Sequence, residues 1–166
     1  ITTLTALGNS MSSYTAQNVG AGKIERIKKG VKYLYIRSFV ITTPLFILYN
    51  FFPDIMMRIF VNSNDITIIN AGMEFLKTVA PFYLFISIKL IIDGVLRGSG
   101  AVNIFMISTF SDLLLRVVLS FALSSIFAQK GIWYSWPIGW LFATAISCTF
   151  YFTGMWKKNI KNLADR

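Results

Sequence analysis

The sequence contains no histidine and a single cysteine, Cys148, which lies inside an apolar run. Zinc sites are built mainly from cysteine and histidine side chains, and one cysteine cannot form an internal disulfide bond, so both features are nearly excluded. An enzyme that works inside a membrane would need paired catalytic groups, and histidine, the usual partner, is missing. We therefore expect no enzymatic activity, no metal site and no cofactor.

Charged residues are also scarce. They form 14% of the 166 residues, against about 25% in a typical soluble chain, whereas hydrophobic residues form 55%. The net charge of +9 is compatible with nucleic acid binding, but eleven of the sixteen Lys and Arg residues fall in three clusters beside apolar runs. Basic clusters that flank apolar runs mark the topology of membrane proteins. The composition thus predicts an integral membrane protein that has the lipid bilayer, and no nucleic acid, as its partner.

The apolar runs predict an all-α helical bundle that forms a single domain over all residues. A span needs about 20 apolar residues, and four runs meet this length: 33–53, 73–94, 103–127 and 132–156. A partial helix at 1–19 precedes them, and a tail at 157–166 follows. Between the helices we expect a glycine-rich turn at Gly94–Gly100, a short helix lying on the membrane at Ile55–Val61 and a polar turn at 62–65.

The distribution of basic residues predicts the orientation of these spans. When the loops are assigned alternately to the two sides of the membrane, eleven Lys and Arg residues fall on one side and two on the other. The positive-inside rule places the basic side in the cytoplasm, so we predict a cytoplasmic C-terminus in a bacterial plasma membrane. The largest cluster, from Lys23 to Arg37, is then a cytoplasmic loop, or a patch for an anionic surface.

The apolar run from Ile104 to Phe127 carries polar side chains at intervals of four: Ser108, Asp112, Arg116, Ser120 and Ser124. Such spacing aligns them on one face of a helix whose other faces are apolar. A narrow polar stripe on a wide apolar surface is typical of a helix in lipid, with the stripe turned toward protein or a water-filled cavity. We expect the stripe to face the bundle, and Asp112 and Arg116 to pair with each other or with a neighbouring residue, directly or through one water. Such a pair is either a structural tie or part of the pathway of a substrate or ion.

Other polar residues are further candidates for such a pathway. Asn9, Ser13 and Gln17 share one face of the first helix, which either packs on neighbours or lines a cavity. Asp93 is placed at the cytoplasmic end of its predicted span, either as an interfacial acid or as the partner of Lys89 one turn earlier.

Five short segments, in this order, carry a resemblance to a known family: Gln17-Asn18-x-Gly20-Ala21-Gly22-Lys23 with Arg26; Ile59-Phe60 before a polar turn; Pro81-Phe82-Tyr83; Gly94-Val95-Leu96-Arg97-Gly98-x-Gly100; and Gly131-Ile132-Trp133 with Trp136-Pro137-Ile138-Gly139-Trp140. Together they resemble the C-terminal lobe of the multidrug and toxic compound extrusion (MATE) family. The residues of the family motifs that we single out are Gln17, Asn18, Gly20, Gly22, Leu96, Arg97 and Gly98.

The resemblance implies a transporter with two lobes of helices, which exchanges a bulky, often cationic, organic substrate for sodium ions or protons. The chain would then hold the end of the eighth helix and helices nine to twelve, and its partner would be the missing N-terminal lobe. Some sodium-coupled members carry an aspartate at a place that corresponds to a position close to Ile86 in this chain. The coupling acid is therefore outside the chain, or is Asp93 or Asp112. The alternative within the superfamily is a flippase of a lipid-linked saccharide.

Overall fold

The computed structural model describes residues 1–61 and 66–164, and throughout these ranges the chain forms helices and no strand. The elements are α1 Thr2–Gly20, α2 Ile24–Phe51, α3 Pro53–Phe60, α4 Ile66–Val79, the 3-10 turn η1 Ala80–Phe82, α5 Tyr83–Gly98, α6 Val102–Phe127, α7 Gln129–Phe152 and α8 Met155–Ala164. The predicted all-α class is confirmed. The predicted turn at 62–65 and the last residues of the predicted tail, 165–166, lie outside the described residues.

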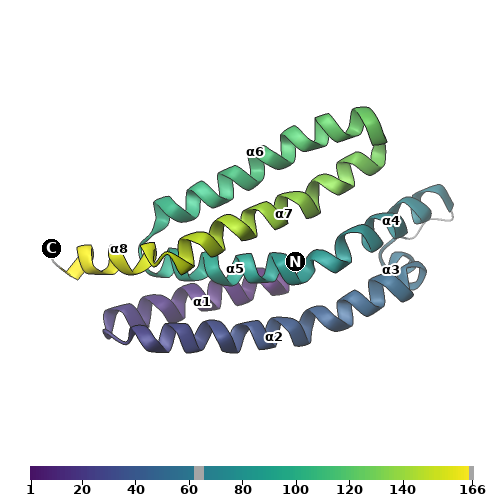
Figure 1. Cartoon of the computed structure of the whole chain (residues 1–166). Helices are drawn as coiled ribbons and strands as arrows, with labels where there is room; N and C mark the ends of the chain where they lie inside the picture. The colour runs from purple at the N-terminus through teal and green to yellow at the C-terminus, as the bar shows by residue number, and fades with distance from the viewer. Residues whose placement is uncertain (62–65, 165–166) are drawn as a thin grey trace.

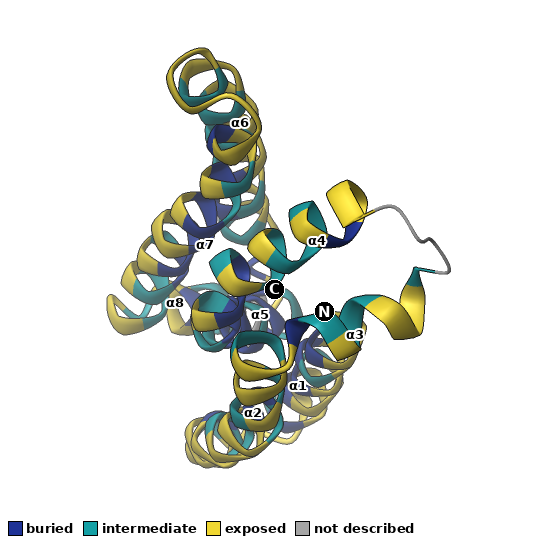
Figure 2. Cartoon of the chain, turned by 90° about the vertical axis from the view of Figure 1, so that its right-hand side faces the viewer, coloured by how far each residue is buried: buried dark blue, intermediate teal, exposed yellow. Residues whose placement is uncertain are grey.

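The helices are arranged in layers around α5 (Figure 1, Figure 2). The antiparallel pair α1 and α2 packs on one side of α5, whereas α7 packs on the other side and separates α5 from α6. The connections alternate between the two ends of the bundle. The α1–α2 turn, the α5–α6 turn and α8 lie at one end, and α3 and the α6–α7 turn lie at the other (Figure 1).

Three helical stretches of the described chain are long and apolar enough to cross a membrane, judged by length and composition. They are α2, the continuous run from Ile66 to Gly98, and α6. The burial of α6 is inverted relative to a helix of a soluble protein, because its only buried residues are Ser108 and Asp112. Most of its large apolar side chains, among them Leu114 and Phe121, are exposed. An apolar outer surface over a polar inner stripe is expected for a helix that faces lipid.

The basic stretch that we predicted to be a loop is helical. α2 begins at Ile24, directly after a turn in which Gly22 adopts a φ of 69°. The prediction of a loop from Lys23 to Arg37 is therefore wrong. Lysine and arginine are good helix formers, and their long stems carry the charge away from the helix axis to water. A basic composition marks the end of a span without ending the helix.

The run predicted as a span at 73–94 is longer and is interrupted by Pro81. Proline has no N–H and cannot donate to the carbonyl of Lys77 one turn earlier, so the helix tightens into the 3-10 turn η1 between α4 and α5. The helix then continues past residue 94 to Gly98.

The glycine-rich segment that we predicted to be a turn is also helical up to Gly98, so this prediction is wrong for most of the segment. Its glycines serve close packing: a Cβ on Gly94 would lie 2.4 Å from the carbonyl oxygen of Gly8, and a Cβ on Gly98 would lie 2.3 Å from that of Ser12. Small residues four apart let two membrane helices approach at backbone distance. Only Gly100, with a φ of 76°, turns the chain toward α6.

The predicted span at 132–156 differs from the structure at both ends. α7 begins at Gln129, after a turn at Ala128 with a φ of 50°, and ends at Phe152. Gly154, with a φ of 73°, then redirects the chain into α8, so the predicted tail at 157–166 is helical as far as Ala164. A positive φ is costly for most residues and easy for glycine, which explains a sharp break at this position.

The short helix predicted at Ile55–Val61 is present as α3, which begins two residues earlier and ends one residue earlier than expected. Arg58 and Asp54 form an exposed ion pair of 2.9 Å, and this hydrogen bond raises the pKa of Arg58 above its ordinary value. Ile59 and Phe60 are exposed, as expected for a helix that lies on a membrane surface. Its location on a membrane stays a prediction.

Candidate functional site

The polar stripe of α6 lies against α7. The hydroxyl oxygens of Ser108 and Ser147 are 2.7 Å apart, and Ser108 also donates to the carbonyl of Ala143 at 3.3 Å. About three turns further along α6, the hydroxyl oxygens of Ser120 and Ser135 are 2.9 Å apart. From Ser108 to Ser120 the stripe therefore faces α7, whereas the Ser124 hydroxyl donates to the Phe121 carbonyl of its own helix at 3.0 Å.

Asp112 and Arg116 form the predicted ion pair at the centre of this stripe, between Oδ2 of the aspartate and Nη2 of the arginine. The side chain of Asp112 is 9% exposed and that of Arg116 is 22% exposed. The guanidinium also lies over the ring of Trp136, 4.7 Å from its centroid. The two charges thus compensate each other at a depth where lipid offers no partner.

The pair leaves two of its polar atoms without a partner among the described residues, Asp112 Oδ1 and Arg116 Nε. Both point to the same place on α7, because a Cβ on Gly139 would lie 2.8 Å from the first atom and 3.6 Å from the second. The absence of a side chain at Gly139 therefore lets the Asp112 carboxylate pack directly against α7, with one acceptor and one donor of the pair left without a partner among the described residues. We call this contact the Gly139 notch.

Lys89 and Asp93 form a second ion pair, 2.6 Å between Nζ and Oδ2, with side chains only 6% and 3% exposed. Ser147 of α7 donates to the other carboxylate oxygen of Asp93 at 2.7 Å. Of our two interpretations, the pairing with Lys89 is confirmed, and the position of Asp93 at the membrane interface stays a prediction. Asp93 is buried because α5 continues beyond it and packs between α1 and α7.

The two sets of polar residues meet at Ser147. Its hydroxyl bridges Asp93 of α5 and Ser108 of α6, so one hydrogen-bonded network connects three helices. A buried network of this kind is stable only when its members are satisfied, and each of these side chains has a partner.

The facing residues on α7 were not among the predicted site residues, although the sequence contains their signal. They are small and recur at intervals of four: Gly131, Ser135, Gly139, Ala143 and Ser147. All five are buried. Small residues at this spacing form the contact surface of many membrane helices. The column was overlooked because the tryptophans of the same segment suggest a membrane interface and not a packed helix.

The predicted residues of α1 are placed differently. Asn9 is exposed, and its side-chain oxygen accepts a hydrogen bond of 3.1 Å from Arg97 Nη2. Arg97 in turn lies over the ring of Phe105, 5.2 Å from its centroid. Gln17 is exposed and takes no part in the hydrogen bonds and ion pairs of the network. The structure therefore does not bring these α1 residues into the network.

The residues of the first family motif shape the end of α1. The Asn18 amide donates to the carbonyl of Tyr14 at 2.8 Å, and the Asn18 carbonyl accepts from the backbone of Lys23 at 2.8 Å. Gly20 is exposed at the last helical position, and Gly22 provides the positive φ of the turn. Leu96 of the second motif is fully buried in the core.

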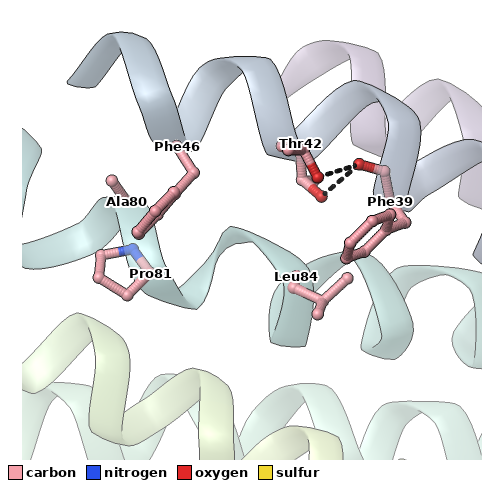
Figure 3. Close-up of a pocket in the computed structure, with 7 residues that line it drawn as sticks. Phe39, Thr42, Phe46, Ala80, Pro81 and Leu84 are labelled. Atoms are coloured by element: carbon pink, nitrogen blue, oxygen red, sulfur yellow. Dashed lines mark hydrogen bonds between the residues drawn. The ribbon is translucent and has the colours of Figure 1, made fainter. Parts of the chain in front are cut away.

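A cavity of about 270 Å³ opens between α2 and the α4–α5 junction (Figure 3). Its wall is largely apolar and includes Phe39, Phe46, Pro81 and Leu84. The Thr42 hydroxyl there is already bonded to the carbonyl of Phe39. None of the predicted site residues lines this cavity. We therefore regard the charged α5–α6–α7 network, and not this cavity, as the candidate site.

No group of three or more Asp, Glu or Cys side chains that could hold a metal ion occurs in the described ranges. The site offers two ion pairs, serine hydroxyls and the close contact of Asp112 with Gly139. Such an arrangement can bind or exchange a small cation, a proton or a polar group of a larger molecule.

Comparison with known proteins adds independent information. A family model described as MatE matches residues 1–122, which run from the first helix into α6. The chain is 26% identical to a probable multidrug resistance protein YpnP of Bacillus subtilis over 153 residues, which cover 92% of this chain and 34% of that protein. It is also 26% identical to a probable multidrug resistance protein NorM of Thermotoga maritima, over 84% of this chain and 30% of that protein.

A probable multidrug resistance protein YoeA of Bacillus subtilis is 27% identical over 92% of this chain and 33% of that protein. The chain therefore spans about one third of the length of the curated relatives that it matches. No solved structure matches it significantly.

Proposed function

Because the chain belongs to the MatE family, we propose that it forms the C-terminal part of a secondary active efflux transporter, which exchanges organic, often cationic, compounds for sodium ions or protons. The observation that carries this proposal is the family match over residues 1–122. The names of the relatives, which refer to multidrug resistance, support it. They do not favour the alternative of a lipid-linked saccharide flippase.

We propose that α7 is a fourth membrane span beside the three helical stretches of suitable length and hydropathy. Its 24 residues extend over about 36 Å, more than the ~30 Å thickness of the hydrocarbon core. It runs antiparallel to α6 after a short turn, so if α6 crosses the membrane α7 must return across it. The basic residues at the end that holds α8 favour a cytoplasmic location for that end.

Within the transporter, Asp112 and Arg116 are the residues that we assign to the substrate or ion pathway. A purely structural pair normally has its buried polar atoms satisfied, whereas this pair leaves an acceptor and a donor free at the Gly139 notch. A group that binds and leaves during each cycle would use such atoms. Lys89 and Asp93 have protein partners, and their proposed part is to link α5 to α7.

Asn9 and Gln17 complete the proposed pathway on α1. Both lie on a side of α1 that the described helices leave exposed. Asn9 already accepts a hydrogen bond from Arg97, but an exposed amide that faces lipid finds no further partner there. We propose that this face is directed toward the N-terminal lobe, which would provide the other wall of the pathway.

Transport by the full-length protein tests the proposal. The protein is reconstituted in liposomes, and ethidium movement is followed under a sodium gradient or a proton gradient. We expect movement driven by one of the two gradients, and strongly reduced movement for Asp112→Asn. Glu74→Gln is the matched control, because Glu74 is an exposed acid 3.2 Å from Lys130.

The chain alone should transport nothing, since half of a pathway between two lobes cannot alternate its access. Absence of gradient-driven movement by correctly folded full-length protein, for a panel of organic cations, would refute the efflux function.

A further inference from the structure

A pocket of about 250 Å³ lies where α2, α7 and α8 meet, at the basic end of the bundle. It is lined by Lys28, Tyr151, Phe152, Trp156 and Lys157. The two lysines are far apart in the sequence and are brought to one pocket by the fold. We call it the lysine–aromatic pocket.

The floor of the pocket is built around Trp156. This side chain is 1% exposed, stacks on Tyr151 with ring centroids 5.8 Å apart, and donates its indole N–H to the Tyr151 carbonyl at 3.1 Å. The positive φ of Gly154 produces the bend that lets Trp156 fold back onto the end of α7. The first turn of α8 is therefore anchored, and Lys157 has a defined position beside the ring, 5.5 Å from its centroid.

The pocket lies where the apolar helix α7 ends and the basic helix α8 begins. Phe152, the last residue of α7, is 80% exposed, and the basic residues of α8 follow it. Aromatic rings next to lysines are typical of the headgroup level of a bilayer, where one end of a residue meets lipid tails and the other meets water. An exposed phenylalanine at this level is suited to contact with an acyl chain.

The charge of the pocket is positive although one acid is near. Lys28 contacts Glu25 at 2.6 Å, but the two side chains are 44% and 77% exposed, and ion pairs in such positions contribute little. Lys157 has no ion-pair partner among the described residues, and exposed Lys29 and Lys158 lie on the same helices. A bound phosphate would therefore replace Glu25 as the ion-pair partner of Lys28 and contact Lys157 as well.

We propose that the lysine–aromatic pocket binds the phosphate of an anionic phospholipid, with Lys28 and Lys157 on the phosphate and an acyl chain along Phe152. A lipid is favoured over free phosphate because the pocket combines two cations with an exposed apolar ring at one edge. This proposal rests on the location of the chain in a membrane, and it does not require that the protein transports drugs.

Lipid binding by the purified protein in detergent tests the proposal. Short-chain phosphatidylglycerol is titrated and its Kd is measured by native mass spectrometry, with phosphatidylcholine and inorganic phosphate as the other arms. Because a basic residue near a membrane surface strengthens binding of an anionic lipid several-fold, we expect Lys28→Gln with Lys157→Gln to weaken phosphatidylglycerol binding about tenfold. The matched control is Lys29→Gln with Lys158→Gln, which removes the same charge outside the pocket and should change the Kd less than about threefold.

Lys28→Arg with Lys157→Arg keeps the charge and should bind like the unchanged protein, which separates loss of charge from loss of fold. Equal weakening in the pocket variant and the control variant would overturn the proposal. So would equal affinity for phosphatidylcholine, or displacement of the lipid by inorganic phosphate at the same concentration. Failure here would leave the transport function standing, because binding is measured without any gradient.

Discussion

Asp112 and Arg116 lie near the middle of α6, where a single charge costs about 2.5–3.5 kcal/mol on insertion scales. Each therefore depends on the other. Removing one partner of a buried pair costs about 3–5 kcal/mol, whereas replacing both by apolar residues is often neutral, and the partial exposure of Arg116 lowers the first figure. We expect Arg116→Leu to reduce the yield of folded protein, and Arg116→Leu combined with Asp112→Leu to restore it, as measured by size-exclusion chromatography in detergent.

Transport by the double variant then separates the two interpretations of this pair. If the double variant folds and no longer exports substrate, the pair belongs to the pathway. If it folds and exports normally, the pair is structural and our assignment of Asp112 and Arg116 to the pathway is wrong.

Loss of the Lys89–Asp93 pair should lower the stability of the fold more than loss of the Asp112–Arg116 pair, because the side chains of Lys89 and Asp93 are almost completely buried. Lys89→Met leaves the Asp93 carboxylate without its cation in the core, and the expected loss is about 3–5 kcal/mol. Lys130→Met is the matched control, since Lys130 pairs with Glu74 at exposed positions and should lose at most about 1 kcal/mol. The thermal unfolding midpoints of the two variants provide the measurement. Equal midpoints would show that the buried network does not stabilise the fold.

At the scale of helices, close contact between α1 and α5 depends on glycines that leave no room for a side chain. A Cβ on Gly94 would lie 2.4 Å from the backbone oxygen of Gly8, and backbone cannot move aside as a flexible side chain can. We expect Gly94→Ala to destabilise the protein by about 1–3 kcal/mol, the usual cost of overpacking. The same change at Gly20, where an added Cβ would meet nothing within 4 Å, is the control. Identical thermal midpoints would mean that α1 and α5 are less closely packed than described.

The α6–α7 hairpin shows the complementary arrangement, because polar side chains of one helix meet small residues of the other. Asp112 needs the space at Gly139, and Ser120 contacts Ser135 directly. Each helix alone exposes polar groups that lipid cannot satisfy, so the two helices stabilise each other in the membrane.

At the scale of the whole molecule, the alternation of connections between the two ends predicts which residues share a side of the membrane. In a protein whose Cys148 is replaced by alanine, we expect Lys29→Cys and Lys158→Cys to react with a membrane-impermeant thiol reagent only from the cytoplasm. Lys130→Cys should react only from outside, because the α6–α7 turn lies at the other end. Labelling of all three positions from the same side would contradict the predicted topology.

The sequence alone determined the membrane class, the helical architecture and the polar stripe of α6. These features depend on local composition and on spacing along one helix, which need no knowledge of the neighbouring helices. The pairing of Asp112 with Arg116 followed in the same way, because both residues belong to α6, one turn apart. The pairing of Lys89 with Asp93 was one of two interpretations for the same reason.

Only the tertiary structure decided what lies opposite each face. The glycines at 94 and 98 are compatible with a turn or with a close helix contact, and the position of Gly8 on α1 selects the second. The burial of Asp93 and its hydrogen bond from Ser147 depend on α7, and Ser147 lies 54 positions after Asp93 in the sequence. Periodicity in the sequence identifies one face of a helix and the polarity of that face. The residues that pack against the face are far away in the sequence. The network at Ser147 is therefore seen only once the helices are packed together.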